Sequence, residues 1–194
     1  MSHVISEAEI EKRLDPRFTR VAKDGDLALA ELNLPTKAAV LDVGTGKGTF
    51  AIYLASRGLD VLTGEPSTDQ SQYANQDWAV QAKEAGVLDR IRFEAFDAGQ
   101  MPFANERFDA VFFFGVLHHV AESERSAVLR EALRVVKDSG AVVFFEPRQA
   151  MLEIVWQTDP HHPPAANPIN YLGAAPVQSR FIEGEWMDLY VLRK

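Results

Sequence analysis

The stretch AAVLDVGTGKGTFAIYL, residues 38–54, constrains the fold of this chain more than any other. It opens with an apolar run, Ala39–Val43, of the kind that a buried parallel strand requires. Gly44, Gly46 and Gly48 follow, and apolar residues then recur at helical spacing. Because glycine accepts positive φ and has no Cβ, this order of strand, turn and helix brings the backbone close to a nucleotide-like ligand.

The spacing of the glycines separates this loop from two other nucleotide-binding loops. A dinucleotide fingerprint reads G-x-G-x-x-G, whereas here the third glycine comes one residue early and Thr49 takes its place. A P-loop ends in Gly-Lys-Ser/Thr, which Lys47-Gly48-Thr49 does not provide. A glycine turn that binds no ligand remains the alternative.

Composition limits the classes of partner. The chain has 194 residues, the size of one domain with a substantial core. Its net charge of −8 argues against nucleic acid or an anionic membrane as the main partner. The absence of cysteine excludes disulfides, thiolate metal ligands and a cysteine nucleophile. Without an apolar run of membrane-spanning length or a signal-peptide core, we expect a cytoplasmic protein.

Helix and strand signals predict a single domain, residues 1–194, in three parts. A leader, 1–37, has one helix beginning near Ser6 and another over 24–32, and it either packs on the sheet or covers the site. The cofactor-binding core, 38–148, alternates strands and helices. The last part, 149–194, has a short helix, a proline-rich loop on the substrate side and a hairpin over 178–192.

The alternation in the core predicts a doubly wound α/β sheet with helices on both faces. Strands are expected at 39–43, 60–64, 90–96, 108–114 and 141–145, and the terminal hairpin adds two more, one of them antiparallel. Helices are expected from Thr49 to Arg57, over 67–85 with Tyr73, Trp78 and Val80 available for burial, and over 122–137 with Gly140 as the cap.

The motif VLDVGTGKG resembles the first motif of the class I S-adenosylmethionine-dependent methyltransferases. The resemblance is to the small-molecule, type 11 branch that includes the ubiquinone and menaquinone biosynthesis enzymes, and it covers roughly residues 40–143. Met101-Pro102-Phe103 and Leu117-His118-His119 are similar to segments of that branch. The resemblance implies a Rossmann-like, seven-stranded fold and an enzyme that moves a methyl group from S-adenosylmethionine to a small molecule, leaving S-adenosylhomocysteine.

Cofactor-binding residues are expected at the ends of four successive strands, where ligands bind in open α/β sheets. Glu65 lies about 20 residues past the glycine loop, where a carboxylate binds ribose hydroxyls, unless it is an ordinary solvated residue. The resemblance implies that Asp97 accepts a hydrogen bond from adenine; the alternative is a turn aspartate. The full set is Asp42, Gly44, Thr45, Gly46, Gly48, Glu65, Pro66, Asp97, Ala98, Phe114 and Gly115.

Histidines are the candidates for acid–base chemistry. The resemblance places His118 and His119 beside the transferred methyl group, where either is a candidate base or a residue that only packs in the loop. His161 and His162 near Asp159 suggest a metal site at first sight. Adjacent histidines on an extended segment point to opposite sides, however, so we expect no metal site.

The acceptor can be narrowed only by elimination. The Asn/Asp-Pro-Pro-Tyr segment of amino-methyltransferases of nucleic acids is absent after the fourth strand, and the lack of cysteine disfavours cytosine C5 and thiol-dependent arsenic methylation. A small-molecule acceptor remains, with a monomer or homodimer as the assembly. Two alternatives stay open: a non-catalytic or partner-dependent relative that binds the cofactor, and an NAD(P)-dependent oxidoreductase, which the glycine spacing disfavours.

Overall fold

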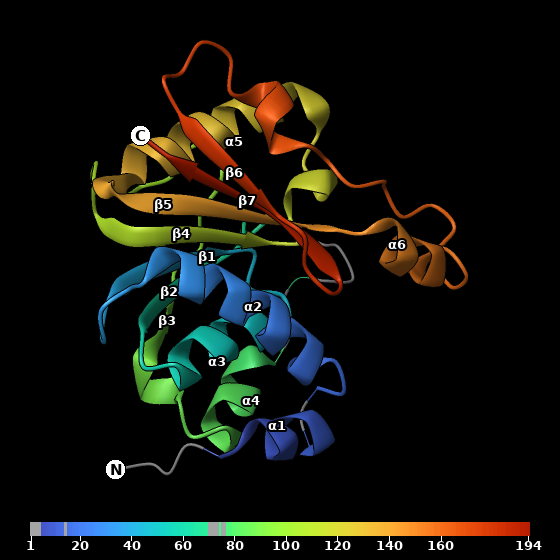
Figure 1. Cartoon of the computed structure of the whole chain (residues 1–194). Coiled ribbons are helices and arrows are strands. Elements are labelled where there is room, and N and C mark those ends of the chain that lie inside the picture. The colour runs from blue at the N-terminus through green and yellow to red at the C-terminus, as the bar shows by residue number, and fades with distance from the viewer. Residues whose placement is uncertain (1–4, 14, 70–73, 75–76) are drawn as a thin grey trace.

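The computed structural model describes residues 5–13, 15–69, 74 and 77–194 (Figure 1). The strands are β1 (Ala39–Val43), β2 (Asp60–Gly64), β3 (Ile91–Phe93), β4 (Phe108–Phe114), β5 (Val136–Pro147), β6 (Gln178–Ile182) and β7 (Met187–Arg193). In the part described they form one seven-stranded sheet in the order β3-β2-β1-β4-β5-β7-β6. The first five strands are parallel, and β7 runs antiparallel to β5 and β6. The predicted Rossmann-like fold is confirmed.

Helices cover both faces of this sheet (Figure 1). They are α1 (Glu7–Arg13), α2 (Phe18–Leu32), α3 (Thr49–Ser56), α4 (Trp78–Glu84), α5 (Glu122–Val135) and α6 (Gln149–Val155), with 3-10 turns η1 (Leu88–Arg90), η2 (Leu117–His119) and η3 (Pro168–Tyr171). The first four helices pack on one face and α5 on the other. None of the helices described is long and apolar enough to cross a membrane.

Alternation along the strands divides the interior into two cores. Phe112 and Phe145 face α2 and α3, whereas Phe113 and Phe144 face α5 and stack with their ring centroids 4.4 Å apart. Because both faces are covered, β4 and β5 carry apolar residues at successive positions rather than at every second one.

The helix predicted over 67–85 is shorter in the structure. Residues 67–68 form a turn in which the Asp69 N–H donates to the Pro66 carbonyl, and α4 begins only at Trp78. Pro66 is the first residue of that turn. Val80, expected to be buried, is 56% exposed. Tyr73 lies outside the described residues.

The predicted end of the helix over 122–137 was also wrong. The α5 helix ends at Val135 and β5 begins at the next residue, with Val136 paired to Phe108 across a register shift. Gly140 lies inside β5 and caps no helix. A Cβ at this position would lie 2.5 Å from the Asp109 carbonyl oxygen, so a close approach of two backbones explains the glycine.

The carboxylate of Asp24, in the middle of α2, ties the leader to the end of the chain. It is fully buried and accepts hydrogen bonds from three consecutive backbone N–H groups, those of residues 185–187, at 2.6, 3.0 and 3.0 Å. These groups lie in the turn between β6 and β7 and at the start of β7. The α2 helix is therefore a fixed part of the core, with 161 to 163 residues between the partners.

Replacing Asp24 should destabilise the whole fold. Asp24→Ala leaves three backbone donors unsatisfied, which should lower the free energy of unfolding by about 3 kcal/mol or more in urea denaturation. The matched control is Asp138→Ala, because Asp138 is mostly exposed and pairs only with Lys194 at the surface, so its loss should cost less than about 1 kcal/mol. Equal effects of the two substitutions would contradict the anchoring role of Asp24.

Candidate functional site

The order of the strands reverses between β1 and β4. From β1 the sheet continues through β2 and β3 on one side, and from β4 through β5 on the other. In open α/β sheets ligands bind beyond the carboxyl ends of the strands at such a point. The glycine loop follows β1 and residues 115–119 follow β4, and a Cβ on Gly44 would lie 2.6 Å from Val116 Cγ2. The two loops are thus in direct contact.

Hydroxyl groups hold the glycine loop in place. The three glycines have φ values of 90°, 48° and 78°, in the left-handed region that favours glycine. Thr63 Oγ1 donates to Asp42 Oδ2 at 2.8 Å and accepts from Thr45 Oγ1 at 2.9 Å, since a carboxylate can only accept. Thr45, inside the loop, is thereby connected to β2 and β1.

Asp42 is a buried carboxyl group that is only half satisfied. The residue is only 1% exposed. Within the described part of the chain its Oδ1 atom has no hydrogen-bond partner. Burial raises the pKa of Asp42 to about 7; the hydrogen bond from Thr63 opposes this rise and the charge of Glu65 adds to it. A donor or cation placed at this carboxyl group would therefore be strongly favoured.

Glu65, at the end of β2, lies against the glycine loop. Its Oε2 accepts a hydrogen bond from the Gly46 N–H at 3.0 Å, and the residue is only 7% exposed. It is not a solvated residue at a strand end. Pro66, the next predicted site residue, is half-buried and begins the turn described above.

The predicted residues after β3 and β4 differ in character. Asp97 is exposed, and its Oδ1 accepts from the Gly99 N–H at 2.6 Å, which is the turn interaction considered as the alternative. Ala98 beside it is half-buried. Phe114 stacks on Phe50 of α3 at 4.7 Å, and Gly115 donates its N–H to the carbonyl of β5 residue Phe145. The β4 end therefore supplies an apolar floor rather than a polar group.

The leader contributes a carboxylate that the sequence did not indicate. Asp15 is 4% exposed and accepts from Thr49 Oγ1 at 2.6 Å, immediately after Gly48. Burial alone would raise the pKa of Asp15, but hydrogen bonds from Arg17 and Thr49 hold it below its usual value. In the sequence Asp15 stands before Pro16 as a simple end of the first helix, and its partner lies 34 residues away.

Three histidines come together beyond the ends of β4 and β5. His118 is buried, and its Nδ1 lies 3.0 Å from Glu146 Oε2. The ring of His119 lies 4.3 Å from that of His118, and the ring of His162 lies 5.2 and 5.0 Å from the two. His161 is exposed and is not part of the group. Neither His162 nor Glu146 was expected beside the His118-His119 pair.

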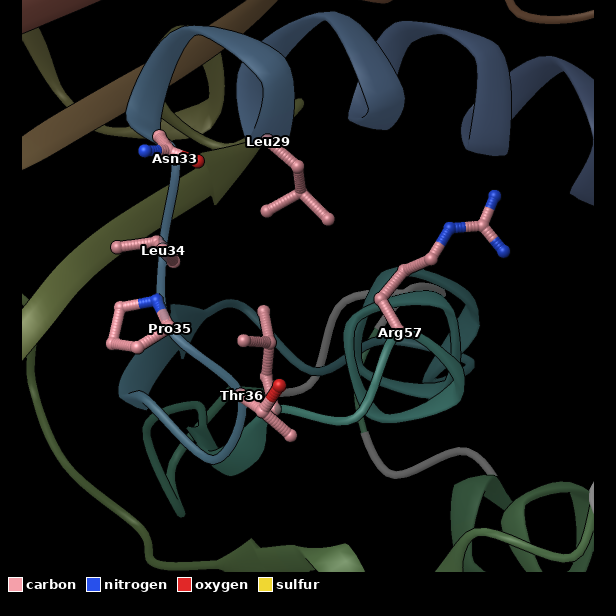
Figure 2. A pocket seen from close by; sticks show the side chains of 7 residues that line it. Leu29, Asn33, Leu34, Pro35, Thr36 and Arg57 are labelled. Atoms are coloured by element: carbon pink, nitrogen blue, oxygen red, sulfur yellow. The ribbon is translucent and has the colours of Figure 1, made fainter.

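Two cavities lie at the other end of the strands, near the residues that precede β1 and β4. Figure 2 shows one of about 140 Å³, lined by Leu29 of α2 and by residues 33–36, which precede β1. Arg57 also lines this cavity, and its guanidinium forms ion pairs with Glu7 and Asp26. A second, of about 420 Å³, is lined in part by Asn105 and Glu106, which precede β4. Neither cavity belongs to the site at the carboxyl ends of the strands.

This architecture, with a glycine loop at the carboxyl ends of its strands, defines an open α/β protein. Residues 41–144 match the methyltransferase domain family. The chain belongs to this family, within the class I small-molecule methyltransferases.

Individual relatives agree with that assignment. Demethylmenaquinone methyltransferase of Mycolicibacterium paratuberculosis is 32% identical over 166 residues, which cover 79% of this chain and 70% of that protein. The 27-O-demethylrifamycin SV methyltransferase of Amycolatopsis mediterranei is 36% identical over 110 residues, or 55% of this chain, but the match spans only 38% of that protein. A SAM-dependent methyltransferase structure from Aquifex aeolicus shares the fold, with a TM-score of 0.64, 19% identity and coverage of 98% of this chain and 100% of that one.

The pKa of Asp42 predicts a pH dependence of stability. Because the native state holds this proton more tightly than the unfolded chain, Asp42 lowers the free energy of unfolding as pH rises from about 4 to about 7, by at most about 1.4 kcal/mol per pH unit. Asp42→Asn should remove this contribution. The free energy of unfolding of the variant should therefore rise relative to that of the parent as pH rises across this range. Urea denaturation at several pH values measures the difference, and parallel pH profiles would refute it.

Proposed function

We propose that this protein transfers the methyl group of S-adenosylmethionine to a small-molecule acceptor and releases S-adenosylhomocysteine. The observation that carries the proposal is the convergence of the glycine loop, Asp42 and Glu65 at the point where the strand order reverses. Membership of the methyltransferase family supports it. We also propose that it works in the cytoplasm, as a monomer or homodimer.

The residues at this edge fit the cofactor. The orphaned Oδ1 of Asp42 and the buried carboxylate of Glu65 suit a ligand that carries positive charge and hydroxyl donors. Residues 44–48 would present backbone groups, Glu65 would take the ribose hydroxyls and Asp97 the adenine amino group. When bound, the cofactor supplies a methyl group already activated on a sulfonium, so the protein mainly positions the partners and excludes water.

The acceptor side of the site holds a candidate proton acceptor. The Glu146 carboxylate can only accept, so His118 Nδ1 carries the hydrogen and its Nε2 is left with a lone pair. That nitrogen is suited to take a proton from an acceptor that must lose one, and Glu146 would stabilise the imidazolium. His119 has a pKa lowered to about 4 by partial burial and by its two histidine neighbours, so it is a weaker base. We therefore favour His118 over His119 for this role.

The two ends of the chain are proposed to enclose the acceptor. Asp15 connects the leader to the start of the glycine-loop helix through its hydrogen bond from Thr49. Glu146, near the end of β5, accepts a hydrogen bond from the Ala166 N–H at 2.8 Å and so holds the stretch after α6. Both segments thus reach the functional edge from outside the 38–148 core. Methyl transfer benefits from the exclusion of water that such coverage provides.

Direct binding tests the proposal. Titration calorimetry on the purified chain should show one site for S-adenosylmethionine, with S-adenosylhomocysteine competing, and a panel of small-molecule acceptors should reveal methyl transfer. Stoichiometric binding of NAD(H) without binding of S-adenosylmethionine would overturn it in favour of an oxidoreductase. Binding of the cofactor without transfer to any acceptor in the panel would favour a non-catalytic relative.

Glu65 should contribute strongly to cofactor affinity. Glu65→Ala removes a charge-assisted acceptor, which should weaken binding of S-adenosylmethionine by about ten- to a hundredfold in calorimetry. Glu65→Gln should weaken it less, because the amide oxygen can still accept from the Gly46 N–H and hold the loop. Glu84→Ala, at the exposed end of α4, is the control and should leave affinity unchanged. An alanine variant at Glu65 that binds as tightly as the parent would rule out the ribose assignment.

A further inference from the structure

The histidine group at the ends of β4 and β5 has the composition and compactness of a metal centre. One ring nitrogen from each of His118, His119 and His162 lies within 4.8 Å of the others. A zinc–nitrogen bond is about 2.0–2.1 Å, which sets ligand nitrogens on a tetrahedral ion about 3.4 Å apart. Closing the group around an ion therefore needs shifts of about 1 Å, within the range of side-chain rotation.

The local backbone explains why two adjacent histidines can share one centre. For His161 and His162, adjacent side chains on an extended segment point to opposite sides, which is why the sequence predicted no metal site there. His118 and His119 instead lie in the 3-10 turn η2, where successive side chains diverge by about 120°, and their rings are 4.3 Å apart. His162 then reaches the pair from the loop after α6, 43 residues along the chain.

Hydrogen bonds already orient two of the rings as metal ligands are oriented. His118 donates from Nδ1 to the Glu146 carboxylate, and His162 donates from Nδ1 to the Pro163 carbonyl at 2.9 Å, because both partners can only accept. Each ring is thereby fixed in the tautomer whose Nε2 lone pair can bind a metal. Metal-binding histidines almost always make such a bond to a carboxylate or carbonyl through the other ring nitrogen.

The charges around the group also call for a cation. Glu146 is 1% exposed, and within the described residues its Oε1 has no hydrogen-bond partner, so a buried anionic group is only partly compensated. A dication here would offset the buried carboxylate.

We propose that His118, His119 and His162 bind a divalent transition-metal ion, zinc being the best match for three neutral imidazoles, with Glu146 positioning His118. Imidazole nitrogen suits zinc, copper, nickel and cobalt, and not the hard ions magnesium and calcium. Three protein ligands leave a fourth tetrahedral position for water or an added ligand. The binding of the ion stands independently of the proposed methyl transfer. A bound ion would occupy the Nε2 lone pair of His118 and would therefore replace that residue as the group that activates the acceptor.

The position of the centre indicates what the open coordination site would hold. Glycine-loop residue Gly44 contacts Val116, one residue before η2, so the ion lies on the acceptor side of the candidate site. A hydroxyl or thiol group bound to it would lose its proton more easily, as zinc-bound water does. This extension, an acceptor with an oxygen or sulfur donor, rests on the proposed function, whereas metal binding itself does not.

Cobalt(II) provides the direct test. The full chain, freed of any polyhistidine tag and treated with a chelator, is titrated with cobalt(II) in a buffer that does not bind metals. We expect one equivalent to give the strong visible absorption of four-coordinate cobalt, and one equivalent of zinc to abolish it. Addition of a small thiol should then shift the spectrum by taking the open position. Cobalt that keeps the weak spectrum of its aqueous ion would overturn the metal site.

Matched variants identify the ligands. His162→Ala should weaken zinc binding by at least about tenfold in competition with a chromophoric chelator, whereas His161→Ala, the adjacent exposed histidine, should bind as the parent does. Glu146→Gln keeps the size of the side chain and should cost about ten- to a hundredfold through the loss of the partner of His118. Circular dichroism confirms that each variant is folded. Equal losses in the His161 and His162 variants, or none in either, would refute the assignment.

These readouts do not depend on S-adenosylmethionine. Metal binding with no cofactor binding would preserve the inference and overturn the proposed methyl transfer. Cofactor binding and methyl transfer without metal binding would overturn the inference and preserve the proposed function, with His118 acting as a base and not as a metal ligand. A thiol that leaves the spectrum of bound cobalt unchanged would show that the centre is closed and refute the open position.

Discussion

The chain of hydrogen bonds from Thr45 through Thr63 to Asp42 is the interaction on which the candidate site depends. It fastens the glycine loop to two neighbouring strands from inside the sheet edge, at 2.9 and 2.8 Å, and Glu65 adds a bond to the Gly46 N–H. Glycines with positive φ are conformationally permissive, so without such bonds the loop would lose its shape. This arrangement buries two carboxyl groups close together, which is unfavourable. The pKa of Asp42 is raised as a result, first by burial and then by the charge of Glu65. A cationic ligand would relieve that cost, which links the stability of the fold to its proposed function.

A second carboxylate, Asp24, performs a comparable task at the other side of the core. By accepting three N–H groups from the terminal hairpin, it joins the first and last parts of the chain across the sheet face that carries the glycine-loop helix α3. Asp15 then connects the same leader to Thr49 at the start of α3. The leader is thus built into the domain, and two buried carboxylates add hydrogen bonds to the apolar packing of side chains such as Ile10 and Phe18.

Glu146 positions two segments on the proposed acceptor side in the same way. It receives the Nδ1–H of His118 and the N–H of Ala166, so one carboxylate positions both the loop after β4 and the proline-rich stretch that brings His162. The glycine-loop side of the site carries acidic groups, and the acceptor side carries imidazoles. This division suits a cationic methyl donor on one side and a nucleophile, activated by a base or a metal ion, on the other.

The sequence by itself determined the sheet and which residues lie at the carboxyl ends of its strands. Apolar runs and glycines are local signals, so β1, β2 and β4 and the order of elements could be predicted residue by residue, and the spacing of Asp42, Glu65 and Gly115 follows from parallel strands ending at one edge. What only the tertiary structure decided depends on contacts between distant segments. Asp15 meets Thr49, Asp24 meets the hairpin, and Glu146 meets His118. The histidine group is the clearest case, because a 3-10 turn holds His118 and His119 side by side and His162 joins them from 43 residues away. No local pattern records such a meeting, because its energy comes from burial and hydrogen bonding that exist only once the chain has folded.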